Sequence, residues 1–186
     1  MSTPYPTLQY GHSDEIGLLR ESVHQFARTE IAPCAADIDR DNEFPRALWA
    51  KMGSLGLLGI TRPDAYGGSG MGYLAAAVVS EELARNDVRF AACFNQQAAT
   101  CPYCIFTAGT VDQVVKYVPT LLAGETIGMM SLTEPGGGSD ALGNMHTRAV
   151  RDGDYYILNG SKMWASMANE TDVGVFMSPT KSFILP

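Results

Sequence analysis

The sequence predicts an α+β fold: an N-terminal α-helical bundle over residues 1–122, followed by an antiparallel β-domain over residues 123–186. Between residues 13 and 122, apolar residues recur at helical spacing in several consecutive segments, and helices in tandem pack as a bundle. From Ile127 onward, short apolar segments are separated by glycine-rich or Asp-Gly turns, which is typical of strands joined by tight connections.

The predicted helices have recognisable start and stop signals. Ser13 is a candidate N-cap, and the acidic residues after it favour the first turn of a helix over residues 13–31. Pro45 suits the first turn of a second helix, which ends in a region rich in glycine. Further helices are expected over residues 74–86, 89–108 and 111–124.

Four later segments have the pattern of strands. They are residues 127–133, 145–150, 154–166 and 172–178. Asp152–Gly153 and Asn159–Gly160 are dipeptides that tight β-hairpins prefer, so each is expected to connect antiparallel strands.

The composition excludes several classes of protein. With 46% hydrophobic and 18% charged residues, the 186-residue chain has the composition of a soluble globular protein. A net charge of −7, without a cluster of basic residues, argues against nucleic acid as a partner. No apolar run is long enough to span a membrane, and the N-terminus lacks the pattern of a secretory signal.

A glycine-rich stretch follows the first predicted strand. Residues 133–140 read TEPGGGSD, and glycines 136–138 permit positive φ angles and backbone N–H groups directed at an anionic or carbonyl oxygen. The Walker pattern would need a lysine after the glycines, and a dinucleotide-binding G-x-G-x-x-G would open a helix, whereas a strand is expected here. The stretch is therefore either a ligand cradle or a flexible surface loop.

Trp164 is a second candidate for ligand contact. It lies in the predicted strand 154–166, and an indole face suits a flat heteroaromatic ring. Ser166 would share that face of the strand. The alternative is a tryptophan buried in the core.

Cys101 to Cys104 form a C-x-x-C motif with Pro-Tyr between the cysteines, as in the redox motif of glutaredoxins. The motif falls within a predicted helix rather than after a strand. Two buried cysteines one helical turn apart more often serve as small apolar core residues than as a redox pair. Thiol-disulfide oxidoreductase activity therefore stays an alternative. No second cysteine pair exists for zinc and the three histidines are scattered, so we assign no metal site and no nucleophile.

Several motifs, taken together and in order, resemble those of acyl-CoA dehydrogenases. SLTEPGGGSDALG matches the family's Thr-Glu-Pro-x-x-Gly-Ser-Asp signature, and LGLLGITRPDAYGGSGMGY, EELAR, YVPTLLAGE and YYILNGSKMW also match. The resemblance covers nearly the whole chain, and the isovaleryl-type branched-chain enzymes are the most similar subfamily. It implies a partial acyl-CoA dehydrogenase fold, with FAD as cofactor and an acyl-CoA thioester as the substrate of α,β-dehydrogenation.

The resemblance also implies particular contacts and partners. The implied flavin contacts are Met130, Ser131, Leu132, Thr133, Gly138, Ser139, Trp164, Ala165 and Ser166. Ser139 would in addition contact the pantetheine arm of the substrate. An electron-transfer flavoprotein or a similar acceptor, and a homotetramer or an assembly with a second chain, are implied as partners.

The chain departs from the family's pattern in three places. Where the family often has Trp-Ile-Thr-Asn or Trp-Ile-Ser-Asn, this sequence has Trp164-Ala165-Ser166-Met167, and the loop that usually precedes the SFILP segment is short. The family's C-terminal helical bundle, which supplies the catalytic carboxylate, has no counterpart in the sequence. We therefore assign no catalytic residue and expect the chain alone to be inactive, with a non-catalytic flavin- or acyl-CoA-binding subunit as an alternative. Without an Arg-rich leader, bacterial cytoplasm is favoured over the mitochondrial matrix.

Overall fold

The computed structural model describes residues 12–179 and 183–185. Most of the N-terminal segment that lacks a secretory pattern (residues 1–11) and part of the short connection into SFILP (residues 180–182) lie outside the described residues.

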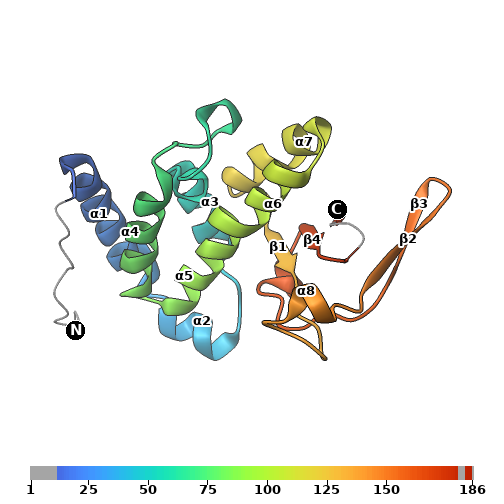
Figure 1. The fold of residues 1–186 in the computed structure, drawn as a ribbon. Coiled ribbons are helices and arrows are strands. Elements are labelled where there is room, and N and C mark those ends of the chain that lie inside the picture. Colours follow the sequence, from blue (N-terminus) through green and yellow to red (C-terminus); the bar gives the residue numbers. More distant parts are fainter. Residues whose placement is uncertain (1–11, 180–182, 186) are drawn as a thin grey trace.

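The first part of the chain is a series of helices that pack side by side (Figure 1). The α-helices are α1 (Asp14–Phe26), α2 (Ala35–Asp41), α3 (Arg46–Ser54), α4 (Gly72–Ala84), α5 (Val88–Asn95), α6 (Cys101–Ala108) and α7 (Val111–Leu122). The shorter helical turns are η1 (Ala27–Ile31), η2 (Leu57–Gly59), η3 (Asp64–Tyr66) and η4 (Gln96–Thr100). The predicted helix 89–108 is thus observed as α5, η4 and α6 end to end. None of the helices in the described ranges is both long and apolar enough to cross a membrane.

The helix ends follow the local chemistry that the sequence indicates. The Ser13 side chain accepts a hydrogen bond from the Ile16 amide at 3.4 Å, which confirms the predicted N-cap of α1. Pro45 lies at the N-cap of α3, immediately before the first turn rather than within it. At the start of α7, Thr110 and Gln113 form a reciprocal capping box, which sequence analysis did not single out.

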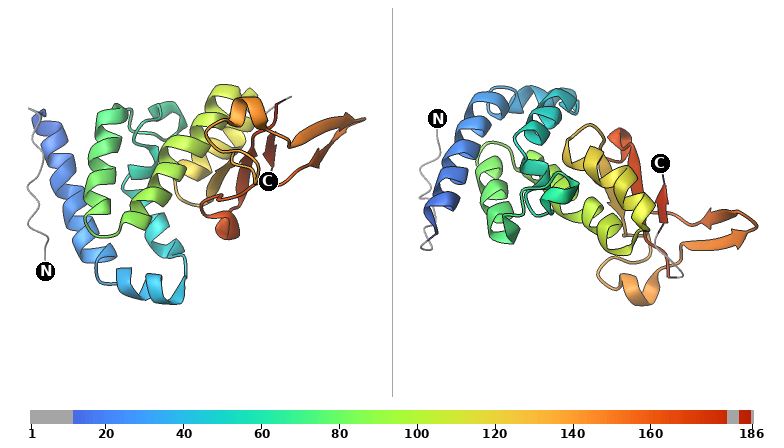
Figure 2. Two further views of the ribbon diagram at one scale, coloured as in Figure 1. Left: turned by 60° about the horizontal axis from the view of Figure 1, so that its bottom comes forward. Right: turned by 90° about the horizontal axis from the view of Figure 1, so that it is seen from above.

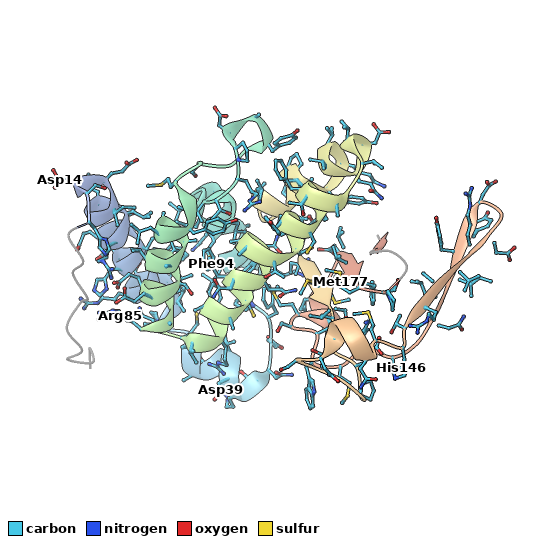
Figure 3. The ribbon with its side chains drawn as sticks, viewed as in Figure 1. Asp14, Asp39, Arg85, Phe94, His146 and Met177 are labelled. Carbon is cyan, nitrogen blue, oxygen red and sulfur yellow. The ribbon has the colours of Figure 1, made fainter. Side chains whose placement is uncertain are left out.

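An aromatic group lies in the core of the helical part. Trp49 is fully buried, and its ring meets those of Phe44 and Phe90 edge to face at centroid distances of 5.2 and 5.6 Å. Phe94, also fully buried, lies in the middle of the helical part in Figure 3. These rings hold α3 and α5 together, and η4 follows directly from α5.

In the rest of the described chain the regular elements are mainly β-strands, which confirms the predicted fold class. β1 (Gly128–Ser131), β4 (Val173–Phe176) and β5 (Phe183–Leu185) form a three-stranded sheet, while β2 (Arg148–Asp152) and β3 (Tyr155–Asn159) form a hairpin. One detail differs from the prediction: β1 pairs with β4 in parallel, and only the β2–β3 and β4–β5 pairs are antiparallel. The long connection between β1 and β4 permits this, since parallel strands need a crossover and not a tight turn. The predicted domain boundary between residues 122 and 123 stays a prediction.

Only one of the two predicted hairpin turns forms. Asp152 and Tyr155 pair across a two-residue turn in which Gly153 has a φ of +59°, as the Asp-Gly dipeptide predicts. Asn159–Gly160 makes no hairpin, and the predicted strand 154–166 is wrong beyond Asn159. At Gly160 a Cβ would lie 2.4 Å from Thr147 Oγ1, so this glycine serves a close approach to the start of β2 instead.

The β2–β3 hairpin projects away from the rest of the molecule in all the views of Figures 1 and 2. It exposes apolar side chains, with Val150, Tyr155 and Ile157 exposed by 58%, 78% and 48%. A two-stranded hairpin with so little cover is at most marginally stable by itself.

Candidate functional site

The end of β1 brings together two segments that are distant in sequence. Met130 and Ser131 lie in β1, and Leu132 and Thr133 follow it directly. The Met163 amide donates a hydrogen bond to the Thr133 carbonyl at 2.9 Å. The residues just after Met163, singled out for ligand contact, therefore lie beside the end of the strand.

Several polar groups at this end of β1 have no protein partner. Ser131 is 1% exposed, and its Oγ atom makes no hydrogen bond. Across residues 12–179 and 183–185, the backbone N–H groups of Leu132 and Thr133 also donate to no protein acceptor. Ser131 is buried, and Leu132 and Thr133 are half-buried. Since buried polar groups in proteins are normally paired, the unpaired Ser131 hydroxyl beside two free N–H groups points to a ligand at this end of the strand.

A buried ion pair holds the turn after β1. Glu134 and Lys162 meet at 2.8 Å, with side chains 5% and 8% exposed. Glu134 also accepts from the backbone amides of His146 at 2.6 Å and Thr147 at 2.9 Å. Figure 3 places His146 at the base of the hairpin, so Glu134 ties that base to β1. The Lys162 ammonium and these amides lower the pKa of the Glu134 carboxyl well below its usual range.

The glycine-rich stretch differs from its prediction. None of Gly136, Gly137 or Gly138 has a positive φ angle, so conformational freedom does not explain this run. Gly138 and Ser139 are exposed, and the chain continues into one turn of helix, α8 (Ala141–Asn144), not into a strand. A Cβ at Gly136 or Gly138 would meet nothing within 4 Å, which leaves open space for a ligand to approach the backbone.

Trp164 is neither in a strand nor in the core. It is 82% exposed and has a φ of +58°, and Met167 has a φ of +62°. Non-glycine residues rarely adopt this conformation, and such strain is concentrated at functional sites. Trp164 and Ser166 therefore do not share a strand face, contrary to the prediction, although both side chains are exposed.

A cleft of about 320 Å³ is lined in part by this segment. Its walls come from the α2–α3 connection, the start of α5 and residues 165–170, and they include Phe44, Phe90 and Cys93. Ala165 and Met167, two of the positions that depart from the family pattern, both line it. Met130 to Thr133 are not among its lining residues.

The C-x-x-C motif does not form a redox site. Cys101 is fully buried at the start of α6, and burial raises the pKa of its thiol to about 12. Burial also raises the pKa of Cys104, whose Sγ lies 3.6 Å from the sulfur of Met130. Because the thiolate is the reactive form, the oxidoreductase alternative has no support at this site. The described residues also contain no cluster of three or more candidate metal ligands.

Sequence reasoning missed the side chains that hold β1 in place. Gln97 is fully buried, and it donates to the Leu121 and Thr126 carbonyls at 2.7 and 2.9 Å and accepts from the Gly128 amide at 2.8 Å. Lys162 lies within the NGSKMW match but was not singled out. Only the fold brings the Gln97 and Lys162 side chains to β1, so no local sequence pattern predicts their role.

Comparison with known proteins agrees with this arrangement. The family model described as acyl-CoA dehydrogenase, N-terminal domain, matches residues 13–125, and the model for the middle domain matches residues 129–182. The chain belongs to the acyl-CoA dehydrogenase family.

Individual acyl-CoA dehydrogenases are similar over nearly the whole chain. Mitochondrial isovaleryl-CoA dehydrogenase of Pongo abelii is 38% identical over 178 residues, covering 95% of this chain and 42% of the relative. A glutaryl-CoA dehydrogenase of Mycobacterium smegmatis, solved with FADH2, has a TM-score of 0.88 and 31% identity, covering 94% of this chain and 46% of that one. A structure described as the electron transferring flavoprotein of Acidaminococcus fermentans, concerning flavin-based electron bifurcation, has a TM-score of 0.87 and 30% identity over 96% of this chain and 49% of that one. The chain thus spans somewhat less than half the length of each of these three proteins.

Proposed function

We propose that this chain forms part of the FAD and acyl-CoA site of an enzyme that dehydrogenates an acyl-CoA thioester between Cα and Cβ. The observation that carries the proposal is the Met163–Thr133 hydrogen bond, which joins the two family motifs at the end of β1. The proposed flavin contacts are those implied by the resemblance: Met130, Ser131, Leu132, Thr133, Gly138, Ser139, Trp164, Ala165 and Ser166.

The groups at the end of β1 suit a flavin. The unpartnered N–H groups of Leu132 and Thr133 match the carbonyl oxygens and ring nitrogens of the polar edge of isoalloxazine. The exposed indole of Trp164 offers an apolar face to a flat ring. FAD, when bound, accepts the β-hydrogen of the acyl-CoA as hydride. Ser139 is exposed, and its hydroxyl is proposed to hydrogen-bond the pantetheine arm.

The proton at Cα needs a base that this part of the structure does not offer. Glu134 is the carboxylate closest in sequence to the end of β1, but Lys162 and two backbone amides hold its charged form. A carboxylate with a lowered pKa is a weak base. We therefore propose that the catalytic carboxylate comes from polypeptide outside the described residues.

The finer assignments follow from the relatives and stay proposals. The substrate is proposed to be a short or branched acyl-CoA, since isovaleryl-CoA and glutaryl-CoA dehydrogenases are similar to the chain. The proposed electron acceptor is an electron-transfer flavoprotein or a similar protein, and the proposed assembly is a homotetramer or a complex with a chain that supplies the base. Bacterial cytoplasm is the proposed location, with the mitochondrial matrix as the alternative.

The first experiment is a titration of the purified chain with FAD, followed by tryptophan fluorescence and by flavin retained on gel filtration. The chain has two tryptophans, of which Trp49 is buried and Trp164 is 82% exposed. We expect FAD to quench the fluorescence of the wild-type chain but not that of the Trp164→Phe variant. Loss of about 0.5–1.5 kcal/mol of ring contact in Trp164→Ala should weaken FAD binding about two- to tenfold.

The outcomes separate the proposed function from its alternative. A chain that retains no flavin and shows no quenching at saturating FAD contradicts the proposed site. If the chain binds FAD, an acyl-CoA and a polypeptide that supplies a carboxylate should together bleach the flavin's visible absorption. A flavin that stays oxidised with every acyl-CoA and partner offered favours a non-catalytic binding subunit.

A further inference from the structure

β1 is an edge strand whose outer edge faces no other strand within the described residues. Its inner edge pairs with β4, where the Ser131 carbonyl accepts from the Met177 amide at 3.1 Å. In a strand, the N–H and C=O of one residue point to the same edge, and those of the next residue point to the opposite edge. The carbonyls of Met130 and Leu132 therefore point to the outer edge.

Side chains take the place of a neighbouring strand along this outer edge. One backbone group of each residue that faces this edge is bonded: the Gly128 amide by Gln97 at 2.8 Å, the Met130 carbonyl by Gln96 at 3.4 Å and the Leu132 carbonyl by Lys162 at 3.0 Å. Gln96 and Gln97 come from the π-helical turn η4, whereas Lys162 comes from the segment that follows β3. π-helical turns are frequent at functional sites.

Lys162 differs from the two glutamines because it brings a positive charge to its backbone partner, the Leu132 carbonyl. The Leu132 carbonyl and the Thr133 N–H belong to the same peptide unit. A cation bonded to the carbonyl oxygen polarises that unit and makes its N–H a stronger donor, because hydrogen bonds in a chain reinforce one another. The Thr133 N–H has no acceptor within the part of the chain that the structure describes.

We propose that Lys162 is a positioning residue that acts through the Leu132–Thr133 peptide to stabilise reduced flavin over oxidised flavin. Reduction places more negative charge on the polar edge of isoalloxazine, and a strengthened Thr133 N–H binds that charge better. Glu134 opposes the effect, since its carboxylate lies 2.8 Å from the same ammonium. The inference rests on the proposed function, because it requires flavin at the end of β1.

Two substitutions with opposite expected results test it. Lys162→Met removes the cation, so reduced FAD should lose about tenfold in affinity relative to oxidised FAD, a midpoint potential lower by about 30 mV for a two-electron couple. Glu134→Gln removes the opposing carboxylate and should move the potential upward. Lys116→Met is the control, because that exposed lysine lies over the Tyr117 ring on α7.

The measurements are the dissociation constant of FAD and the midpoint potential of the flavin-loaded chain, with circular dichroism to check folding. A purely structural role for the pair would weaken FAD binding in both variants without shifting the potential in opposite directions. Equal potentials for wild type and Lys162→Met, or shifts of the same sign in both variants, overturn the inference. If Lys162→Met fails to fold, the upward shift in Glu134→Gln decides the question. A wild-type chain that takes up no FAD instead contradicts the proposed function, and the inference falls with it.

Discussion

Two glycine-to-alanine substitutions should change the stability of this chain in opposite directions. Gly17 lies in the exposed part of α1, where a Cβ would meet nothing within 4 Å. Gly53 lies in α3, where a Cβ would be 1.9 Å from the Ala123 carbonyl oxygen and 2.9 Å from the Gly124 nitrogen. Both neighbours of Gly53 are backbone atoms, which no change of side-chain rotamer can move.

The expected magnitudes follow from these distances. Alanine is better than glycine in a helix by about 1 kcal/mol, so Gly17→Ala should stabilise the chain by about that amount. In Gly53→Ala the same gain is opposed by overpacking, which costs about 1–3 kcal/mol, and a contact against backbone belongs at the upper end of that range. We expect a net loss of about 2 kcal/mol. For a chain of this length, that is a midpoint temperature about 4–8 °C lower, against an increase of about 2–4 °C for Gly17→Ala.

The assay is urea and thermal unfolding of the two variants beside the wild-type chain, followed by circular dichroism. Because both variants have the same chemical change in an α-helix, the difference between them isolates the crossing of α3 with the end of α7. If Gly53→Ala is as stable as wild type, or is stabilised as Gly17→Ala is, the backbones of α3 and the end of α7 are not in close contact. That result would refute the close packing described for this junction.

Three further predictions concern the buried polar groups and the cysteines. Because the pKa of Glu134 is lowered in the folded state, its contribution to stability is complete at neutral pH and is lost as the pH falls below about 4.3, the ordinary pKa of Glu. Unfolding measured across this range should show a flatter pH dependence for Glu134→Gln than for wild type, and parallel curves would contradict the ion pair. Gln97→Leu removes three hydrogen bonds worth about 1 kcal/mol each, so urea unfolding should report a loss of about 3 kcal/mol, whereas Gln25→Leu on an exposed helix face should stay within about 0.5 kcal/mol. Cys101 should react with a thiol reagent at pH 8 only after unfolding, and Cys101→Ser should leave any activity with glutathione unchanged; rapid labelling of the folded chain at Cys101 would contradict its burial.

Sequence analysis succeeded where the signal is local. The Ser13 cap and the Asp152–Gly153 turn depend on a few neighbouring residues, and both formed as predicted. Asn159–Gly160 has an equally good hairpin pattern, yet its glycine is required for contact with Thr147, which only the fold brings near. A local motif therefore shows what a segment can do, and distant contacts decide what it does.

The candidate site divides in the same way. The family motifs predict that Thr133 and Trp164 contact one ligand, and the Met163–Thr133 hydrogen bond brings their segments together. The buried Lys162–Glu134 pair and the parallel pairing of β1 with β4 could not be predicted. Both depend on which elements meet after a long connection, and neither leaves a periodic pattern in the sequence.

The side chains along the outer edge of β1 also affect the order in which the chain folds during synthesis. Gln97 holds the Gly128 amide from within the helical part, so β1 can be fixed on one side as soon as the first 130 or so residues have emerged. The other side of β1 can pair only when β4 has been made. The Ile127 amide, just before β1, donates to the Asp172 carboxylate just before β4, which is 45 residues further along the chain. At about 5–20 residues per second, a ribosome needs about 2–9 s to supply that partner. Throughout that interval the nascent chain exposes an unpaired strand edge next to a folded helical domain, which makes this the stage of synthesis most open to wrong pairing and to capture by a chaperone.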